Sequence, residues 1–489
     1  MSHAAPDRPW TPERSRQVVR GRVVLRVRPG EDPDEVPTHL EVARGRASAL
    51  PRLDGGGIDR VLRRHSPAVR VSRVYPAART VMRFGARRPA WDDLEVATGM
   101  SRTFRVDLDP DVSLLAVVQS LSELGTVEMA CPHYLSVTPF EDTAEPLGAD
   151  AFYGHRMVGA ESALAHEPGD TALIVAIVDS GVDLTHPELA GRLRPGVDTV
   201  DLAQGLVSRG LRLFGDTHRR DREPTDEMGH GSACAGIIGA KGLRLGPGVG
   251  GAARLLPVRV LAGARMVDKA TPTAIGAVPD IDAGVKAAVD LGARVLNLSF
   301  GTPESALRAE DPRPHEDVIA YARARGCVLV AASGNGGDSG RYFPAALPGV
   351  IAVGSVGPPG APSRFTSRGP HVALCAPGES IPSASLGGAL QSHTGTSFAA
   401  PVVAGACALL LARASRMSQG LDPHTLRELL VRSARPFPAG VDASGCGAGI
   451  LDIPAALRAL EDVLVEAEGE AGAVGPTPAA LTAHSGAPR

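Results

Sequence analysis

The sequence is poor in lysine, in aromatic residues and in long apolar segments. Lysine occurs only at Lys241, Lys269 and Lys286, and the arginines are scattered, so at a net charge of −3 nothing indicates a nucleic-acid partner. No run of about 18 apolar residues is free of charges and turn formers, so no membrane span and no membrane partner is expected. Residues 1–30 lack the apolar core and cleavage site of a secretory signal peptide.

Cysteine is the next scarce residue type. The six cysteines are dispersed, lie mostly in apolar runs and show no metal-ligand spacing. We therefore expect buried thiols and no metal site built from cysteine. Together with the missing signal peptide this favours a cytoplasmic protein, although export by another route remains open. We expect a monomer.

Changes in composition divide the chain. Its 489 residues, 43% of them hydrophobic, exceed one ordinary domain. The polar first residues and the small, polar tail are expected to be disordered, and a short Pro/Gly-bearing stretch separates two globular units. The predicted boundaries are a disordered N-terminus at 1–19, a first domain at 20–140, a linker at 141–150, a large domain at 151–463 and a disordered tail at 464–489.

The large domain alternates short apolar runs with helical patterns. Residues 173–178, 295–298, 328–332 and 350–353 read as buried strands, and residues 282–291 and 315–325 read as helices. Strands without in–out alternation, separated by helices, predict an α/β fold with a mostly parallel sheet covered by helices on both faces. Function in such a sheet collects at the carboxyl ends of the strands.

The first domain has a different order of elements. Strand patterns begin at GRVVLRVR, AVRVSRVYP, SRTFRVDL and TVEMACPHYLSV, and helical patterns lie at GIDRVLRRH and SLLAVVQSLSELG. This order is β-α-β-β-α-β, which predicts a small α+β domain of the ferredoxin-like kind.

Two motifs in the large domain carry an aspartate and a histidine. Asp179 follows a buried strand in IVAIVDSGVDLTHPEL, where a carboxylate needs a partner. His230 stands between two glycines in MGHGSACAGIIGA, which leaves room for a substrate backbone. Alone, each is more often a turn residue or a structural histidine.

Two further motifs carry a serine and an asparagine. Ser397 opens an apolar helix in SHTGTSFAAPVVAGACALLL, where free backbone N–H groups favour a negative charge. Asn335 lies in the glycine-flanked loop of CVLVAASGNGG, from which its amide could donate into a cleft. Such residues are usually only a helix cap and a turn residue, so the combination of the four motifs is what indicates acyl-transfer chemistry.

These segments resemble the four signatures of the subtilisin-like (S8) serine peptidases, over about residues 151–460. The resemblance implies a serine endopeptidase acting through an acyl-enzyme. Ser397 would be the nucleophile, His230 the general base and acid, Asp179 the residue that orients His230, and Asn335 the oxyanion donor. The triad order Asp, His, Ser is that of subtilisin.

The resemblance also implies where a substrate binds. Ser299, Phe300 and Gly301, with Ala332, Ser333 and Gly334, resemble the two segments that line the specificity pocket and pair with an extended protein or peptide substrate. Tyr342, in RYFPAALPG, stands where the family often has a small residue, which predicts a shallow pocket for small or medium side chains.

Three positions depart from common family patterns. Cys234 follows His230 by one helical turn, so its thiol is either core packing or a site of sensitivity to thiol reagents. Glu188 keeps one feature of a family calcium site, but the loop 241–253 has no Asn or Asp, so that site is expected to be absent. No cofactor is expected for the chemistry, and structural calcium elsewhere stays open. The charged insertion 202–227 reads as a solvated loop, with cation binding as the alternative.

The first domain resembles a subtilisin propeptide in its order of elements. That resemblance implies an inhibitor and chaperone whose last strand lies in the cleft and which is removed by self-cleavage within about 138–150. The alternatives are a permanently attached regulatory domain and, for the whole chain, an inactive subtilisin-like binding module.

Overall fold

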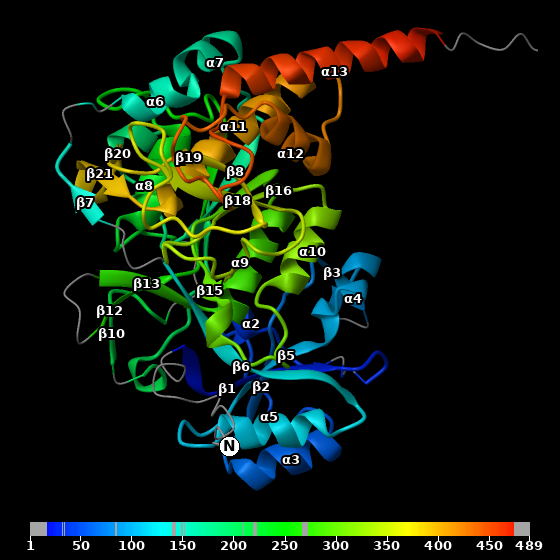
Figure 1. Cartoon of the computed structure of the whole chain (residues 1–489). Helices are drawn as coiled ribbons and strands as arrows, with labels where there is room; N and C mark the ends of the chain where they lie inside the picture. The colour runs from blue at the N-terminus through cyan, green and yellow to red at the C-terminus, as the bar shows by residue number, and fades with distance from the viewer. Residues whose placement is uncertain are drawn as a thin grey trace, which may run out of the picture.

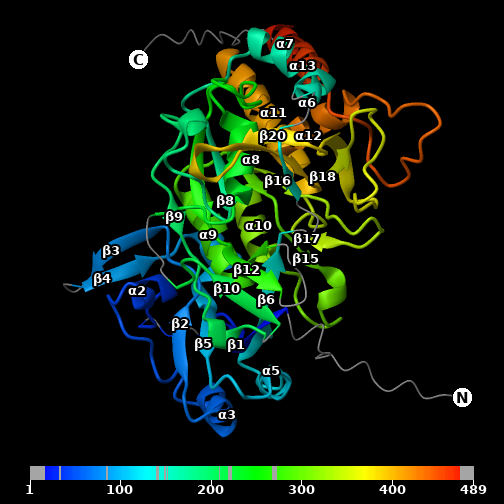
Figure 2. The same cartoon turned by 90° about the vertical axis from the view of Figure 1, so that its left-hand side faces the viewer.

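The structure is a computed structural model. It describes residues 17–473 except 32, 34, 84–85, 139–142, 148–149, 151, 209, 219–222 and 267–271. A smaller N-terminal domain, blue to cyan in Figure 1, lies against a larger domain, and the turned view in Figure 2 shows the same division.

A seven-stranded parallel sheet forms the centre of the large domain. All its pairings are parallel, and their order is β19-β18-β16-β14-β8-β11-β9. The strands are β8 (Ile174–Asp179), β9 (Val197–Asp198), β11 (Arg254–Arg259), β14 (Val295–Leu298), β16 (Val328–Ala332), β18 (Val350–Val356) and β19 (Val372–Pro377). The predicted strands at 173–178, 295–298, 328–332 and 350–353 are all confirmed.

Helices cover both faces of this sheet, which confirms the predicted α/β class (Figure 1). Val175 and Ile177 of β8 pack toward one hydrophobic cluster, while Ala176 and Val178 pack toward another. Because both faces are buried, the strand needs no polar alternation. One face carries α8 (His230–Gly239) and α11 (Thr396–Arg416). Helix α13 (Ile453–Ala473) packs on α11, and α12 (Pro423–Arg432) packs on α13 and β19. The other face carries α9 (Val278–Asp290) and α10 (Glu316–Ala324).

Helix α11 is the most apolar of these elements. In the described part of the chain it is the one helix long and apolar enough to cross a membrane, yet 94% of the relevant window is buried inside the protein. Its composition is accounted for by its place between the sheet and α13, since a helix that is apolar all round belongs in a core.

The N-terminal domain has the predicted order of elements. Its strands are arranged β6-β1-β5-β2 and pair antiparallel, with helices α3 and α5 packed on them. These elements are β1 (Val18–Val27), α3 (Gly57–His65), β2 (Arg70–Arg73), β5 (Thr103–Asp107), α5 (Leu114–Ser122) and β6 (Val127–Val137). Sequence analysis did not predict α2 (His39–Ala43), the hairpin of β3 (Arg79–Arg83) with β4 (Ala86–Ala90), or α4 (Asp93–Ala97).

The sheet of the N-terminal domain does not end at β6. It continues through β13 (Pro272–Ala277), β12 (Ala262–Met266) and β10 (Leu211–Phe214) of the large domain, giving seven antiparallel strands shared by the two domains. Strand β10 lies inside the insertion 202–227, so the interpretation of that insertion as a solvated loop was wrong for this part. The strand is stabilised by a partner that is distant in sequence, which local patterns do not reveal.

The structure also shifts three predicted boundaries. Strand β1 starts at Val18, inside the N-terminus predicted to be disordered, and α13 continues to Ala473, inside the tail predicted from 464. Part of the predicted linker forms β7 (Thr143–Glu145), which pairs with β21 (Leu390–Thr394). Residues 1–16 and 474–489 lie outside the described residues. The remaining elements are α6 (Tyr153–Val158), α7 (Ala160–His166), β15 (Thr302–Pro303), β17 (Tyr342–Phe343) and β20 (Ile381–Ala384).

Candidate active site

Asp179 and His230 are joined by a hydrogen bond at the carboxyl end of the parallel sheet. Asp179 is the last residue of β8 and His230 is the first residue of α8. His230 Nδ1 lies 2.7 Å from Asp179 Oδ1, which also accepts a bond of 2.7 Å from the Ser180 backbone N–H. The aspartate is fully buried, so the imidazole and the backbone supply the hydrogen bonds that a buried carboxylate requires.

A glycine next to the histidine lets these two elements approach. A Cβ atom at Gly231 would lie 2.0 Å from the carbonyl oxygen of Gly181 and 3.1 Å from the Cβ of Asp179. No side chain fits there without moving the turn that follows Asp179 or the start of α8. Gly231 of the histidine motif is therefore needed for the close approach of His230 to Asp179.

Ser397 lies in the same site, at the start of α11. Its hydroxyl donates to the backbone carbonyl of Ser299 at 3.4 Å, and its own carbonyl accepts from the hydroxyl of Ser299 at 2.9 Å. The ring of Phe398 packs against the ring of His230 with centroids 5.2 Å apart. The structure therefore brings Asp179, His230 and Ser397 into one buried cluster, as the motifs predicted.

The thiol of Cys234 lies beneath this cluster. It is 3.8 Å from Asp179 Oδ2 and 3.5 Å from the carbonyl oxygen of Ser397. Cys234 is fully buried, as are the other cysteines, none of which is in a disulfide. The expectation of buried thiols is confirmed. The suggested sensitivity to thiol reagents stays a prediction.

Asn335 reaches the site from the loop after β16. Its Oδ1 accepts from the backbone N–H of Thr396 at 3.0 Å and from the Thr396 hydroxyl at 2.7 Å. These two bonds orient the amide, and its buried Nδ2 has no hydrogen-bond acceptor among the described residues. A buried donor left open costs free energy unless a ligand uses it. Sequence analysis missed Thr396, although its place directly before Ser397 was the available signal.

Asp226 is a second residue that sequence analysis missed. It lies in the charged insertion 202–227, which was interpreted as a solvated loop, but it is buried and accepts five hydrogen bonds. The donors are the side chains of Ser180 and Ser232 and the backbone N–H groups of Met228, Gly229 and Ser232. Burial raises the pKa of Asp226, and these donors oppose that shift. Asp226 thereby ties the turn after Asp179 to the start of α8.

The end of strand β6 pairs with the predicted substrate-binding segment at Gly301. Val137 and Gly301 exchange both backbone hydrogen bonds, of 3.0 and 2.9 Å. On its other side Val137 is paired with Ile275 of β13. An extended chain held between two strands is the geometry of peptide recognition by strand addition.

The same chain meets the protease again beyond the site. Strand β7 pairs with β21, with Thr143 opposite Thr394, and β21 leads directly into the turn before Ser397. Thr138 donates its backbone N–H to Ala274 in β13. Thr138 and Thr143 therefore each pair with a strand of the large domain, and residues 139–142 between them lie outside the described residues.

The predicted pocket segments differ in what they contact. Gly301 pairs with the N-terminal chain, whereas the side chain of Phe300 is buried in the core. Gly334 receives the ring of Tyr342 so closely that a Cβ atom there would lie 2.5 Å from its Cδ2, and one at Gly301 would lie 3.5 Å from its Cδ1. The ring of Tyr342 thus lies between the two glycines that end the predicted pocket walls. Ala332 and Ser333 are buried beside them at the end of β16.

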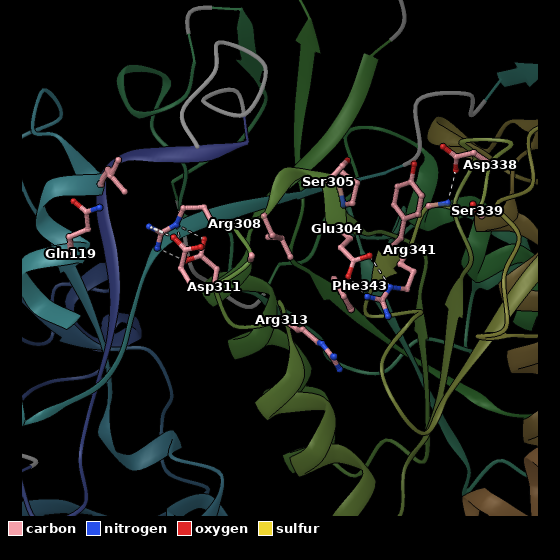
Figure 3. Close-up of a pocket in the computed structure, with 17 residues that line it drawn as sticks. Gln119, Glu304, Ser305, Arg308, Asp311, Arg313, Asp338, Ser339, Arg341 and Phe343 are labelled. Atoms are coloured by element: carbon pink, nitrogen blue, oxygen red, sulfur yellow. Dashed lines mark hydrogen bonds and ion pairs between the residues drawn. The ribbon is translucent and has the colours of Figure 1, made fainter. Parts of the chain in front are cut away.

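A hollow of about 990 Å³ lies beside this region, between the two domains (Figure 3). Leu115 and Gln119 of α5 form one wall, and residues 303–313 and 338–343 form the rest. Figure 3 shows Arg341 turned toward Glu304 and Arg308 turned toward Asp311, and both pairs are hydrogen bonded. Because these arginines are paired with carboxylates, and Arg313 and Asp338 in the same lining have opposite charges, the hollow offers no single-sign surface to a ligand.

The carboxylate of Glu188 is hydrogen bonded to backbone N–H groups. Its carboxylate accepts four backbone N–H bonds from consecutive residues, 242 to 245, at 2.5 to 3.1 Å. Burial opposes ionisation, but these bonds outweigh it and lower the pKa of Glu188. The loop that would hold calcium therefore presents donors to this carboxylate.

A second group of side chains could also hold a metal ion. Asp179, His230 and Cys234 have their possible ligand atoms within 4.8 Å of one another, but Asp179 and His230 already share a hydrogen bond.

Comparisons with known proteins agree with this geometry. Residues 170–449 match the model of the subtilase family, peptidase S8. The chain is 32% identical to a thermophilic serine proteinase of Bacillus sp. (strain AK1) over 65% of this chain and 70% of that protein. It is 31% identical to thermitase of Thermoactinomyces vulgaris over 58% of this chain and 90% of that protein.

A solved structure also matches the fold. A protease of Pseudoalteromonas arctica aligns with a TM-score of 0.54 and 25% identity, over 66% of this chain and 99% of that one. The matched family segment contains all four catalytic candidates and both predicted pocket segments. The chain belongs to the subtilase family of serine-type endopeptidases.

Proposed function

We propose that this chain hydrolyses protein or peptide substrates through an acyl-enzyme formed on Ser397. Ser397 Oγ attacks the scissile carbonyl, and His230 takes its proton and later delivers it to the leaving amine. The 2.7 Å bond from Asp179 to Nδ1 leaves Nε2 of the imidazole to act on the serine, and it stabilises the imidazolium. This bond, at the end of a buried strand, is the observation that carries the proposal.

Asn335 and the backbone N–H of Ser397 would stabilise the oxyanion. The amide of Asn335 is oriented by Thr396, and its Nδ2 is buried and open. A donor fixed in advance needs no reorganisation when charge develops on the carbonyl oxygen, and such a donor typically supplies about 3 to 4 kcal/mol of transition-state stabilisation.

The N-terminal domain is proposed to inhibit the enzyme until the chain is cut. Val137 takes the place of a substrate residue opposite Gly301, and β7 holds the chain on the far side of the site. Residues 139–142 between these two contacts lie outside the described residues, and we propose that one of their bonds reaches Ser397. Self-cleavage is therefore proposed within residues 138–143, a narrower range than the 138–150 expected from sequence.

Two other functions remain as alternatives. A permanently attached regulatory domain would keep β6 and β7 in place without cleavage. An inactive binding module would keep the fold and lose the chemistry. Asp179, His230, Ser397 and Asn335 are all present and clustered, which favours an active enzyme.

Intact mass measurement of the wild-type chain and the Ser397→Ala variant tests this function. The expected result is a cut within residues 138–143 in the wild type and an uncut Ser397→Ala chain. A full-length chain in both proteins would contradict self-cleavage and support an attached domain. Labelling by a fluorophosphonate, lost in Ser397→Ala, reports the nucleophile separately, and a wild-type chain that is neither cut nor labelled would support the binding module.

A further inference from the structure

The residue before Val137 sends its hydroxyl into the large domain. Ser136 Oγ lies 2.7 Å from the hydroxyl of Thr302 and 3.0 Å from Nε2 of His315. His315 Nδ1 lies 2.6 Å from Asp282 Oδ1. All four side chains are buried, so each of these polar atoms depends on its neighbours for hydrogen bonds.

With a neutral imidazole at His315, the hydrogen bonds form a relay that runs in one direction. Asp282 accepts the Nδ1 proton of His315, which leaves Nε2 of a neutral imidazole as an acceptor. Ser136 donates its hydroxyl proton to that nitrogen, and its oxygen then accepts from the hydroxyl of Thr302. The position of Ser136 Oγ needs a group that donates to His315 and accepts from Thr302. The oxygen of a hydroxyl group can do both.

The backbone of His315 supports this reading. It adopts φ = 69°, a left-handed conformation that side chains other than glycine seldom take, and it stands just before α10. The edge of its ring packs on Phe300, with centroids 5.5 Å apart at an interplanar angle of 70°. A strained, buried histidine held by an aspartate and an aromatic ring is positioned for a contact on its remaining nitrogen.

The arrangement has the residue types of a catalytic triad but cannot act as one. Ser136 is fully buried within β6, which is paired on both sides. The cavity that His315 and Asp282 line measures about 50 Å³, too small for a substrate. Ser136 is therefore a bound group in this site.

We propose that Thr302, His315 and Asp282 form a polar subsite that selects a serine or threonine in the substrate. That residue would stand directly before the one paired with Gly301, and Ser136 occupies the subsite in this structure. Thr302 and His315 contact the hydroxyl, and Asp282 positions His315. The inference rests on the proposed function, because it assumes that a substrate binds in the position that β6 occupies.

An alanine in place of the hydroxyl residue would leave Nε2 of His315 and the hydroxyl of Thr302 buried without partners. A site built to hydrogen-bond a hydroxyl discriminates against a substrate that lacks it. Leaving these groups unsatisfied is expected to lower kcat/KM by roughly 10- to 100-fold. Threonine keeps the hydroxyl, so it should be cleaved within a few-fold of serine.

The test uses internally quenched peptides that copy residues 132–146 of this chain, with Ser, Thr, Ala or Leu at the position of Ser136. The full chain is the enzyme, and mass spectrometry identifies the cleaved bond. Any fraction of enzyme whose cleft is still occupied lowers kcat/KM equally for every peptide, so the ratio between peptides is unaffected. We expect a Ser/Ala ratio of roughly 10 to 100 in the wild type and a ratio near one in His315→Leu.

His424→Leu is the matched control, because His424 is exposed on α12, and it should keep the wild-type ratio. Should His315→Leu fail to fold, His315→Asn replaces it, since asparagine tolerates left-handed backbone. A wild-type Ser/Ala ratio within twofold of one, or a ratio unchanged in the His315 variants, overturns the inference.

Two further measurements separate this failure from that of the proposed function. A chain that reacts with a fluorophosphonate and digests casein, yet shows a flat ratio or leaves all four peptides uncut, overturns the subsite alone. A chain that does neither overturns the proposed function and the subsite with it.

Discussion

The protein contains two seven-stranded sheets that are built in opposite ways. The parallel sheet lies inside the large domain, its central strands are apolar, and Asp179 and Asn335 stand at or just after its strand ends. The antiparallel sheet is shared by the two domains, and charged residues are buried where they meet. Arg22, His39 and Arg105 of the N-terminal domain surround Asp201 of the large domain.

The two sheets differ in the interactions that stabilise them. Apolar packing on both faces makes the parallel sheet a rigid support for the catalytic candidates. The junction between the domains depends instead on backbone pairing and buried ions, whose net stability is small but whose disruption is costly. The first sheet carries the catalytic candidates, and the second, through β6, brings Val137 against Gly301, which is the basis of the proposed control of access.

The largest effect is expected at the end of the parallel sheet. Asn335→Ala removes the proposed oxyanion donor and should lower kcat roughly 10²- to 10³-fold with little change in KM. Steady-state kinetics on a peptide substrate measures both. Asn297→Ala, at a buried asparagine within β14, is a useful contrast because it should act on stability. An Asn335→Ala variant with unchanged kcat would remove Asn335 from the mechanism.

The next largest effect is expected at the junction of the domains. Asp201→Ala leaves the buried Arg22 and Arg105 with Asp107 as their remaining shared partner. This loss should cost roughly 3 kcal/mol and expose the cleft about 100-fold more often. Burial opposes ionisation, but the hydrogen bond with His39 and the charges of Arg105 and Arg22 outweigh it and hold the pKa of Asp201 far below its ordinary value. The measurement is the rate of fluorophosphonate labelling of the full chain.

Asp111→Ala is the control for the junction, because the Arg20–Asp111 pair is largely exposed and should contribute little. Equal labelling rates in Asp201→Ala and the wild type would show that the buried ions do not hold the N-terminal domain in place.

A third prediction concerns Tyr342, whose ring lies between the pocket glycines Gly301 and Gly334. Tyr342→Gly opens the space that the ring fills, so substrates with phenylalanine directly before the cleaved bond should gain roughly 10- to 100-fold in kcat/KM relative to alanine. A peptide-library profile measures this ratio. A wild-type enzyme that already prefers large aromatic residues there would contradict the shallow pocket.

The smallest effect is expected at Glu188. Glu188→Gln weakens its bonds to the loop 242–245 and should lower the free energy of unfolding by about 1 to 2 kcal/mol, whereas exposed Glu161→Gln should not. Because the pKa of Glu188 is lower when folded than its ordinary value of 4.5, this stabilisation is present above pH 4.5 and is lost as the pH falls through the folded pKa.

Thermal unfolding of wild type and Glu188→Gln, followed from pH 7 down to pH 3, measures the effect. The two curves should converge as the pH falls. A large loss of stability on adding a chelator at pH 7 would indicate a bound cation instead and contradict the expectation of no calcium at this loop.

Most of the parallel sheet was predictable because its strands are marked by local composition. The runs ending near Asp179, Leu298 and Ala332 are short, apolar and bounded by turn residues. The hairpin of β3 and β4 was missed because RTVMR and ARRPA are rich in charge and carry no apolar alternation. Strand β10 was missed because its stability comes from pairing with β12, distant along the chain.

The catalytic candidates were predictable for a similar reason. Asp179, His230, Ser397 and Asn335 each stand in a motif whose neighbours serve the site, as Gly231 does beside His230. Asp226 and Thr396 were missed because an acidic or hydroxyl residue in a loop looks the same whether it is solvated or buried under hydrogen bonds. Their roles follow from partners that the sequence does not identify.

The amino-acid sequence alone determined the family, the parallel sheet and the choice of the four catalytic candidates, because short stretches of chain encode each of them. Tertiary structure alone decided which distant residues meet at the candidate site. Val137 meets Gly301, Ser136 meets His315 and Asp282, and the ring of Tyr342 meets Gly334, each across a long separation in sequence. Hydrogen bonds and ring contacts of this kind form only once packing has brought the two domains together.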